Sequence, residues 1–380
     1  MARNDLFRVV VAGGGTGGHV YPTLAVLQAL TARCVELKAP IEITRMGPSD
    51  GYEALFQNLG ARISPIVAGK VRRYASLQNF IDIPKFIIGF IQALAKLYVI
   101  MPDIVFSKGG TGALPVVLAA WCYRIPVAIH ESDAKPGLTN LMSARFAKKV
   151  FVSFSEAARY FYEKKVQVTG TPLRAELFAN PTTKPLAKEA LGFGASVPLI
   201  LVLGGSQGSR RVNDFILANL VEITKISQVL HQTGVANLTD AEKLSRAALI
   251  DETVRNRYHA TGYLDKDITL ALTGADLVVA RAGSGTLAEL AAFGLPAILI
   301  PLPESANDHQ RINAYDFSKN GAAVVIEEAN LLPGIFLGQM KAILGDDAAR
   351  EKMAAGSREH FVPDAAASIA QALIDMSAAA

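Results

Sequence analysis

The sequence predicts an α/β protein made of two Rossmann-like, doubly wound parallel-sheet domains that face each other across a cleft. Three observations support this prediction. Short β-rich runs alternate with helical patterns along most of the 380 residues, a strand, a glycine turn and a helix open the chain, and the same pattern restarts at Leu199. Such alternation is typical of a parallel sheet covered by helices on both faces. Ligands of these sheets bind at the carboxyl ends of the strands.

The segment Thr171–Val197 is rich in Pro, Thr and Lys, which suits a linker. We therefore place an N-terminal domain at residues 1–172 and a C-terminal domain at residues 173–362, and we expect the last helix, residues 363–378, to pack back on the first domain. The expected strands of the first domain are Phe7–Ala12, Ile41–Met46, Arg62–Ile66, Ile104–Ser107, Val127–Ile129, Lys149–Val152 and Val166–Val168. Those of the second are Leu199–Leu203, Gln228–Gln232, Asp276–Ala280, Pro296–Ile300 and Ala323–Ile326.

The stretch Val9–Pro22 is the most informative part of the chain, because five glycines and His19 follow an apolar strand. A helix is expected to open at Pro22. Glycines let the backbone adopt positive φ and approach a ligand closely, and the start of a helix offers unpaired N–H groups to an anion. A diphosphate is therefore the expected ligand, and a tight turn without a ligand is the alternative.

Composition and motifs exclude several classes of function. The net charge of +4 does not indicate a nucleic-acid-binding protein, no Cys or His spacing resembles a metal site, and no cofactor is expected. The glycine turn lacks the G-x-G-x-x-G spacing and the acidic residue of a dinucleotide site. Charged residues interrupt the apolar region Ile81–Phe106, which falls short of the roughly 20 clean residues of a spanning helix. Because the chain opens directly into a strand, we expect no signal peptide and a location in the cytosol or on the inner face of a membrane.

The second domain carries a further candidate site at Ala280–Gly294, where a strand leads through glycines into a helix. Ser284, Gly285 and Thr286 can donate hydrogen bonds to a phosphate, and Glu289 can accept both hydroxyls of a ribose. The alternative is a simple helix cap followed by a solvated acidic residue. Downstream, Gln310 can present its amide to a sugar hydroxyl.

Seven motifs occur in an order that resembles the MurG family of glycosyltransferases, and they cover nearly the whole chain. They are GGTGGHVYPTLAV, FSKGG, HESDAKPGLTN, TGTPLR, LGGSQGS, ARAGSGTLAELAAFGLPAILIPLP and NDHQRINA. The resemblance implies the GT-B fold and an inverting, metal-independent reaction. In it, N-acetylglucosamine (GlcNAc) passes from UDP-GlcNAc to the C4 hydroxyl of undecaprenyl-diphospho-MurNAc-pentapeptide (lipid I), giving lipid II. That reaction belongs to peptidoglycan synthesis, and hence to cell-wall biogenesis, cell shape and cell division.

The resemblance also implies roles for individual residues. His19 would be the general base, and Arg174 and Ser206 would meet the donor diphosphate. The backbone of Leu264 would read uracil. The other implied contacts are Thr16, Gly17 and Gly18 near the acceptor diphosphate or donor sugar, Ser284, Gly285, Thr286, Leu287, Ala288 and Glu289 at phosphate and ribose, and Gln310 at the sugar. Helix N-termini and Arg174 can stabilise the departing diphosphate in place of Mg²⁺, and histidine suits the activation of a sugar hydroxyl.

Two departures from the family pattern concern the acceptor side. Thr111 stands where the family has an aromatic residue, and the family's His-Glu-Gln-Asn reads His-Glu-Ser-Asp here, ending at Asp133. A carboxylate cannot donate the hydrogen bond of an amide. We keep Asp133 as a candidate substrate-binding residue, and the departures leave another lipid acceptor, such as diacylglycerol, as the alternative. A UDP-GlcNAc 2-epimerase and a nucleotide-sugar sensor are further alternatives.

A helix from Pro84 is the expected membrane contact. On a helical wheel Ile87, Ile91, Leu94 and Tyr98 form the expected core stripe, whereas Phe86, Phe90 and Leu97 lie on a neighbouring face. With Lys70, Arg72 and Arg73 before it, Phe86 and Phe90 would meet an anionic membrane surface, and a helix buried on two sides is the alternative. We expect a peripheral protein on the cytoplasmic side of the cell membrane, with UDP-GlcNAc, lipid I and the anionic inner-membrane surface as its partners.

Overall fold

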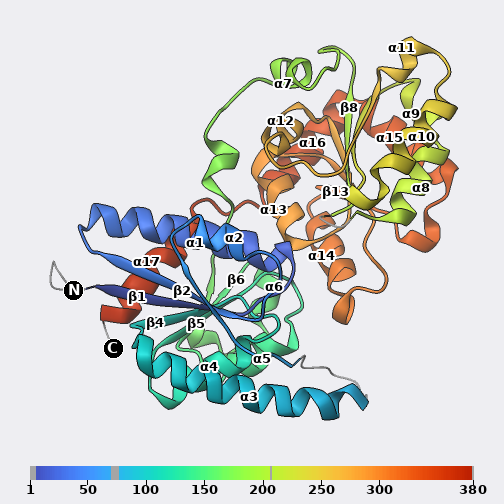
Figure 1. Cartoon of the computed structure of the whole chain (residues 1–380). Helices are drawn as coiled ribbons and strands as arrows, with labels where there is room; N and C mark the ends of the chain where they lie inside the picture. Colours follow the sequence, from blue (N-terminus) through green and yellow to red (C-terminus); the bar gives the residue numbers. More distant parts are fainter. Residues whose placement is uncertain (1–5, 70–76, 206–207, 379–380) are drawn as a thin grey trace. The chain divides into compact units, whose positions relative to one another are not determined.

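The structure is a computed structural model, and it describes residues 6–69, 77–205 and 208–378. The chain divides into two compact units. Unit 1 comprises residues 1–174 and 362–380, and unit 2 comprises residues 175–361. Each unit is an α/β domain around its own parallel sheet, which confirms the predicted fold class (Figure 1).

In the described residues, unit 1 has a seven-stranded sheet in the order β3-β2-β1-β4-β5-β6-β7. The strands are β1 (Phe7–Ala12), β2 (Ile41–Gly47), β3 (Arg62–Pro65), β4 (Ile104–Ser107), β5 (Val127–Glu131), β6 (Lys149–Val152) and β7 (Val166–Val168). All pairs are parallel, as buried β-rich runs separated by helices require. The order reverses next to β1, so the carboxyl ends of β1 and β4 flank the crevice where such sheets bind ligands.

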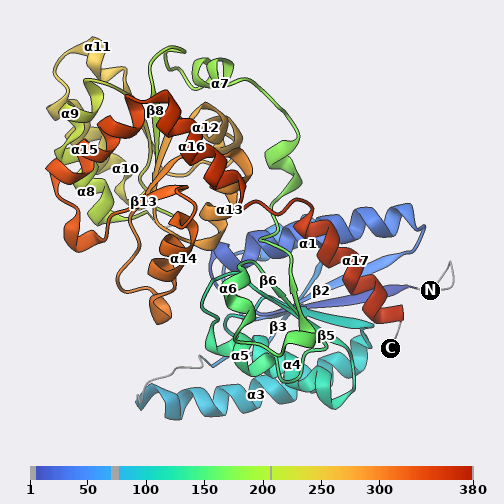
Figure 2. The ribbon, with the colours of Figure 1, turned by 180° about the vertical axis from the view of Figure 1, so that it is seen from behind.

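Helices cover both faces of this sheet (Figures 1 and 2). They are α1 (Gly17–Glu36), α2 (Glu53–Gln57), α3 (Leu77–Ile100), α4 (Ala113–Cys122), α5 (Leu138–Ser143), α6 (Ser155–Ala158) and α17 (Ala365–Ala378). One core joins β1 and α1 to Ile369 and Leu373 of α17, both of which are fully buried. The other core joins the opposite face of the sheet to α3 and α4. The last helix is therefore part of the hydrophobic core of unit 1.

In unit 2, the described residues form a six-stranded sheet in the order β10-β9-β8-β11-β12-β13. The strands are β8 (Leu199–Leu203), β9 (Gln228–Gln232), β10 (Tyr258–Thr261), β11 (Leu277–Ala280), β12 (Ala297–Leu299) and β13 (Ala323–Val325). The helices are α7 (Lys184–Ala190), α8 (Arg210–Ala218), α9 (Leu220–Thr224), α10 (Leu238–Ala248), α11 (Glu252–Arg255), α12 (Ile268–Gly274), α13 (Ser284–Phe293), α14 (His309–Ser318), α15 (Pro333–Leu344) and α16 (Asp347–Arg358). The edge strand β10 was not predicted, because only its first residue is buried and its sequence lacks an apolar run.

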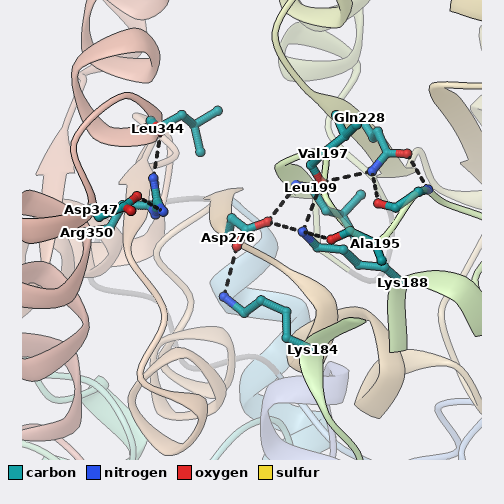
Figure 3. Close-up of polar contacts among 11 residues, drawn as sticks. Lys184, Lys188, Ala195, Val197, Leu199, Gln228, Asp276, Leu344, Asp347 and Arg350 are labelled. Atoms are coloured by element: carbon teal, nitrogen blue, oxygen red, sulfur yellow. Dashed lines mark hydrogen bonds and ion pairs between the residues drawn. The ribbon is translucent and has the colours of Figure 1, made fainter. Parts of the chain in front are cut away.

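A buried ion pair fastens α7 to the amino-terminal edge of this sheet (Figure 3). Lys188 and Lys184 both point toward Asp276, with Nζ to carboxylate oxygen distances of 2.6 and 3.0 Å, and the Leu199 amide donates to the same carboxylate at 2.8 Å. Burial by itself would raise the pKa of Asp276, but the bonds from Lys188 and the Leu199 amide and the charge of Lys184 hold that pKa below its usual value. The cluster therefore ties the linker to unit 2.

Candidate active site

The first glycine turn connects β1 to α1, and α1 begins at Gly17 rather than at Pro22. The prediction took Pro22 as the first residue of the helix, whereas it lies inside the helix, where a proline cannot donate a hydrogen bond to the carbonyl of Gly18. Thr16 is the N-cap residue with an extended backbone (φ −90°, ψ 170°). His19 therefore belongs to the first turn of α1, beside the unpaired amides of the helix start.

Neighbouring strand ends hold this turn on both sides. The Gly13 amide donates to the Met46 carbonyl at 3.0 Å, and Gly14 forms a backbone bridge with Thr111. Gly13 has φ +110°, and a Cβ there would lie 2.2 Å from the Gly109 carbonyl oxygen. A side chain at Gly13 would push the two loops apart. Thr111 contributes through its backbone, so the missing aromatic ring does not remove this contact.

The exposed rim of the turn carries the predicted residues Thr16, Gly18 and His19. Thr16 and Gly18 are exposed, His19 is half-buried, and Gly17 is buried. The imidazole lies against the turn, since a Cβ on Gly15 would be 3.1 Å from His19 Nδ1. The structure thus brings a histidine and the amides of a helix start to one edge of the unit 1 sheet.

A buried polar cluster that the sequence analysis missed lies behind this turn. Lys108, which follows β4, is 5% exposed and hydrogen-bonds to Ser132 Oγ. Burial lowers the pKa of Lys108 to about 8, although the charges of Glu131 and Asp133 act in the opposite direction. Together with His19 and other residues, Lys108 lines a cavity of about 20 Å³, which is large enough for one water molecule. The signal for this cluster was a lysine directly after a buried strand.

Glu131, the last residue of β5, organises the loop that carries Asp133. Its carboxylate accepts hydrogen bonds at 3.0 Å from the amides of Asp133 and Gly137 and from the side chain of Asn140. Burial and the charge of Asp133 raise the pKa of Glu131, and the three hydrogen bonds oppose that rise. Asp133 itself is half-buried, so the departure from the family places a second carboxylate beside Glu131.

Arg174, the last residue of unit 1, packs against α1. Its guanidinium carbon is 4.6 Å from the centre of the Tyr21 ring on α1, a cation–π contact that holds the long side chain against that helix. Arg174 is half-buried, and its charge remains near the first turn of α1.

In unit 2, α13 presents its N-terminus at the carboxyl end of β11. Ser284 is largely buried, whereas Gly285, Thr286, Ala288 and Glu289 are half-buried. The structure removes the predicted contact at Leu287, because its side chain is 1% exposed and its amide donates to the Gly283 carbonyl within the helix. The first amides of α13 and the Glu289 carboxylate are the groups that could hold a phosphate and a ribose.

Gln232, at the end of β9, links two loops of the expected donor site and was missed by the sequence analysis. Its Oε1 accepts the Leu264 amide at 3.0 Å, and its Nε2 donates to the carbonyl of Gly205 in the second glycine loop at 3.1 Å. Leu264 is buried, and its amide is already used in the hydrogen bond to Gln232. The Leu264 carbonyl is therefore the part of this backbone to consider for a base.

Arg281 is a second missed residue, and it lies directly before the α13 loop. It is 7% exposed, and its Nη2 donates to Ser209 Oγ at 2.8 Å and to Glu328 Oε2 at 2.6 Å. Ser209 is the N-cap of α8. Arg281 therefore connects the start of α8 with the loop before α13.

Gln310 is the second residue of α14, and its oxygen is already used. Oε1 accepts the Leu302 amide at 3.0 Å, so the NH₂ group is the end of this side chain that could donate to a sugar hydroxyl. Four predicted residues lie outside the described residues: Ser206, Lys70, Arg72 and Arg73.

The helix α3 begins at Leu77, so Pro84 lies inside it rather than at its start. Its faces are the reverse of the prediction except at Leu94, which packs on the core as predicted. Phe90 and Leu94 pack against the core together with the fully buried Leu97, whereas Ile87 and Ile91 are 51% and 58% exposed. The structural reason lies at Gly89, where a Cβ would be 2.1 Å from the Val67 carbonyl oxygen, so the backbones touch on that side of the helix. The exposed isoleucine face of α3 consists of Ile83, Ile87, Ile88 and Ile91.

Comparison with known proteins agrees with this architecture. The N-terminal domain of glycosyltransferase family 28 matches residues 9–152, and the C-terminal domain of the same family matches residues 199–369. A relative from Clostridium tetani is 35% identical over 337 residues, which are 88% of each chain. It is named UDP-N-acetylglucosamine–N-acetylmuramyl-(pentapeptide) pyrophosphoryl-undecaprenol N-acetylglucosamine transferase. This chain belongs to the MurG family of glycosyltransferases.

Solved structures point the same way. MurG of Acinetobacter baumannii superimposes with a TM-score of 0.75 at 26% identity, covering 97% of this chain and 99% of that protein. A UDP-GlcNAc 2-epimerase from Neisseria meningitidis gives 0.68 at 14% identity, covering 98% and 100%. At that identity the second likeness shows the shared fold alone. Membership of the MurG family thus confirms the predicted GT-B fold and the predicted glycosyltransferase activity.

Proposed function

We propose that this chain transfers GlcNAc from UDP-GlcNAc to the C4 hydroxyl of lipid I, giving lipid II, with inversion at the anomeric carbon and without a metal ion. The observation that carries the proposal is the match over 88% of the chain to a relative named for this transfer. The reaction needs a base for the acceptor hydroxyl and positive groups for the departing diphosphate, and the two units hold residues of both kinds.

His19 takes the role of general base in this proposal. A sugar hydroxyl is a weak nucleophile, and removal of its proton as the new bond forms lowers the barrier. His19 is half-buried beside the exposed residues Thr16 and Gly18 of the turn, which supports an approach of the acceptor from that side. A single displacement at the anomeric carbon, with His19 taking the hydroxyl proton, inverts its configuration.

The departing UDP is stabilised by fixed positive groups. In unit 2 the N-terminus of α13 points its first amides toward the phosphates, and Glu289 accepts the ribose hydroxyls. Arg174 adds a full positive charge, held in place against Tyr21. Within unit 2, the amides of α13 are held by the fold, and fixed dipoles of this kind need no reorganisation as negative charge grows on the diphosphate.

Transfer assays with two acceptors test the substrate and the role of metal. With labelled UDP-GlcNAc and a short-chain lipid I analogue we expect product, and EDTA should change the rate by less than about twofold. Removal of an essential metal would instead cost several kcal/mol of transition-state stabilisation and therefore lower the rate by orders of magnitude. Diacylglycerol is the parallel acceptor, because Thr111 and Asp133 depart from the family pattern near the acceptor. Product on diacylglycerol alone would contradict the proposed acceptor.

We further propose that unit 1 binds the cytoplasmic surface of the membrane through the exposed isoleucine face of α3. Within the described residues the stretch Asp82–Ile100 of α3 is, contrary to the sequence prediction, long and apolar enough by length and composition to span a membrane. Its mean hydropathy is 1.6, and only 17% of it is buried. Trp121 at the end of α4 is 55% exposed and borders a groove of about 490 Å³ that also contains Arg124, Arg145, Lys148 and Lys165. Apolar side chains beside basic ones suit a peripheral contact with anionic lipid.

Replacing Ile87 and Ile91 by glutamate should weaken binding to anionic liposomes by roughly 100-fold or more, because each buried aliphatic side chain contributes on the order of 1.5 kcal/mol. The measurement is cosedimentation with vesicles, and the melting temperature checks the fold. Val35→Glu is the matched control, since Val35 is 71% exposed on α1. Equal binding by the double variant and the control would exclude this face. Phe90 is unsuitable for the test, because it packs on the core.

A further inference from the structure

A carboxylate from a neighbouring loop holds the first glycine turn. The Gly15 amide donates to Asp50 Oδ2 at 3.0 Å, and Asp50 belongs to the segment between β2 and α2. Backbone groups hold Gly13 and Gly14, whereas a side chain holds Gly15. A single substitution can therefore release this point of the turn and leave the other contacts in place.

Asp50 is itself fixed by a buried cation. Arg45 Nη2 lies 2.5 Å from Asp50 Oδ2, and the Arg45 side chain is 3% exposed. Its guanidinium carbon is 4.9 Å from the centre of the Phe56 ring. Glu53 completes the cluster, because its Oε1 accepts the Asp50 amide at 2.9 Å and lies 3.8 Å from Arg45 Nη1. The orientation of the Asp50 carboxylate is thus fixed before any substrate arrives.

The residue that Asp50 holds is the one against which the His19 ring rests. A Cβ built on Gly15 would lie 3.1 Å from His19 Nδ1, so the space between Gly15 and the imidazole does not accommodate a side chain, and a movement of Gly15 toward the ring would displace the ring. The Gly15 amide is also engaged in its hydrogen bond to the Asp50 carboxylate. A diphosphate at this turn therefore has the amides at the start of α1, at Gly17 and Gly18, and not the Gly15 amide.

We propose that Asp50 is a positioning residue for the transfer reaction. Supported by Arg45, it fixes Gly15, which sets the orientation of the His19 imidazole toward the acceptor hydroxyl. The inference rests on the proposed role of His19 as the base. Asp50 acts through the turn and touches neither the substrate nor the reacting atoms.

The test is a double-mutant cycle with His19. Asp50→Ala removes the acceptor of the Gly15 amide and should lower kcat by about 30-fold, because misplacement of a catalytic group by about 1 Å can cost 100-fold. The KM for UDP-GlcNAc should change by less than about twofold, since Asp50 does not contact the donor. Asp50→Asn retains an oxygen that can accept the amide and should recover most of the rate. In a His19→Ala background, Asp50→Ala should have no further effect, because two residues that act as a unit are not additive.

Two additional variants separate positioning from folding. In the Asp50→Ala variant the buried Arg45 loses its closest carboxylate, which can destabilise the fold. The double variant Arg45→Met with Asp50→Ala removes that charge as well, and the loss of kcat should persist in it. Glu53→Gln, on the same arginine but not on Gly15, should keep kcat within about twofold. Equal fold reductions by Asp50→Ala with and without His19 would overturn the inference. Full activity of His19→Ala would instead overturn the proposed base, and with it the ground for this inference.

Discussion

Alanine at position 19 is expected to lower turnover by roughly two to four orders of magnitude, because general-base catalysis contributes about that much. Binding of UDP-GlcNAc should be largely kept, since the proposed donor contacts of unit 2 do not involve this side chain. Single-turnover transfer to the lipid I analogue measures the first quantity, and calorimetric titration with UDP-GlcNAc measures the second. A fall in kcat at constant donor affinity is the mark of an interaction made in the transition state.

His259→Ala is the matched control for this experiment. His259 is also half-buried, and its ring stacks on Phe193 with 4.3 Å between the ring centres, in a place that the proposal does not use. The His259→Ala variant should retain the turnover of the wild-type enzyme. Unchanged turnover of His19→Ala would remove this histidine from the role of base, and a substrate phosphate would then be the next proton acceptor to examine.

The largest expected effect on stability comes from Asp276→Asn in unit 2. This change leaves Lys188, which is 4% exposed, without its carboxylate, and breaking a buried ion pair from one side costs about 3–5 kcal/mol. Figure 3 shows that Lys184 reaches the same carboxylate, with a side chain that is 46% exposed. Lys184→Met should therefore cost no more than about 1 kcal/mol. Hydrogen exchange at the amides of β8 and β11 measures the unfolding free energy of unit 2.

The same pair predicts a pH dependence. The pKa of Asp276 is lowered in the folded protein, so its contribution to stability is complete above the pKa of about 3.9 of an unfolded aspartate and is lost as the pH falls through the lower, folded value. The difference in stability between the wild type and Asp276→Asn should accordingly be constant near neutral pH and shrink below about pH 4. A difference that stays constant to lower pH would show that the charge of Asp276 does not stabilise unit 2.

The strands of both sheets other than the edge strand β10 could be predicted, because buried parallel strands have sequences that are short apolar runs between helices. The buried face of α3 could not be predicted, because the helix carries isoleucine and phenylalanine side chains on several of its faces. The hydrophobic period therefore does not distinguish the buried side. The informative residues were the small ones. Gly89 and Ala93, four residues apart, lie where α3 packs closely, and both are buried. The start of α1 was misplaced for a related reason, since a proline marks a helix start only on average.

For the site, motif resemblance gave the residues that we propose to face substrates, whereas the residues behind them were found only in the structure. Asp50, Lys108, Gln232 and Arg281 lie on or after strands that are distant from their partners along the chain. Gln232, for example, bonds the amide of Leu264, 32 positions away. Sequence patterns report local period and turn chemistry, and contacts of this kind depend on which strands become neighbours.

The burial of α17 in unit 1 has a consequence for the order in which the protein is made. On the ribosome, residues 1–174 leave the exit tunnel first, then all of unit 2, and only then the segment 362–380 that contributes Ile369 and Leu373 to the core beneath α1. The apolar surface of α1 that these side chains cover therefore stays exposed to solvent, or bound by a chaperone, until unit 2 has been synthesised. Unit 1, most of which is translated before unit 2, is thus completed only after unit 2.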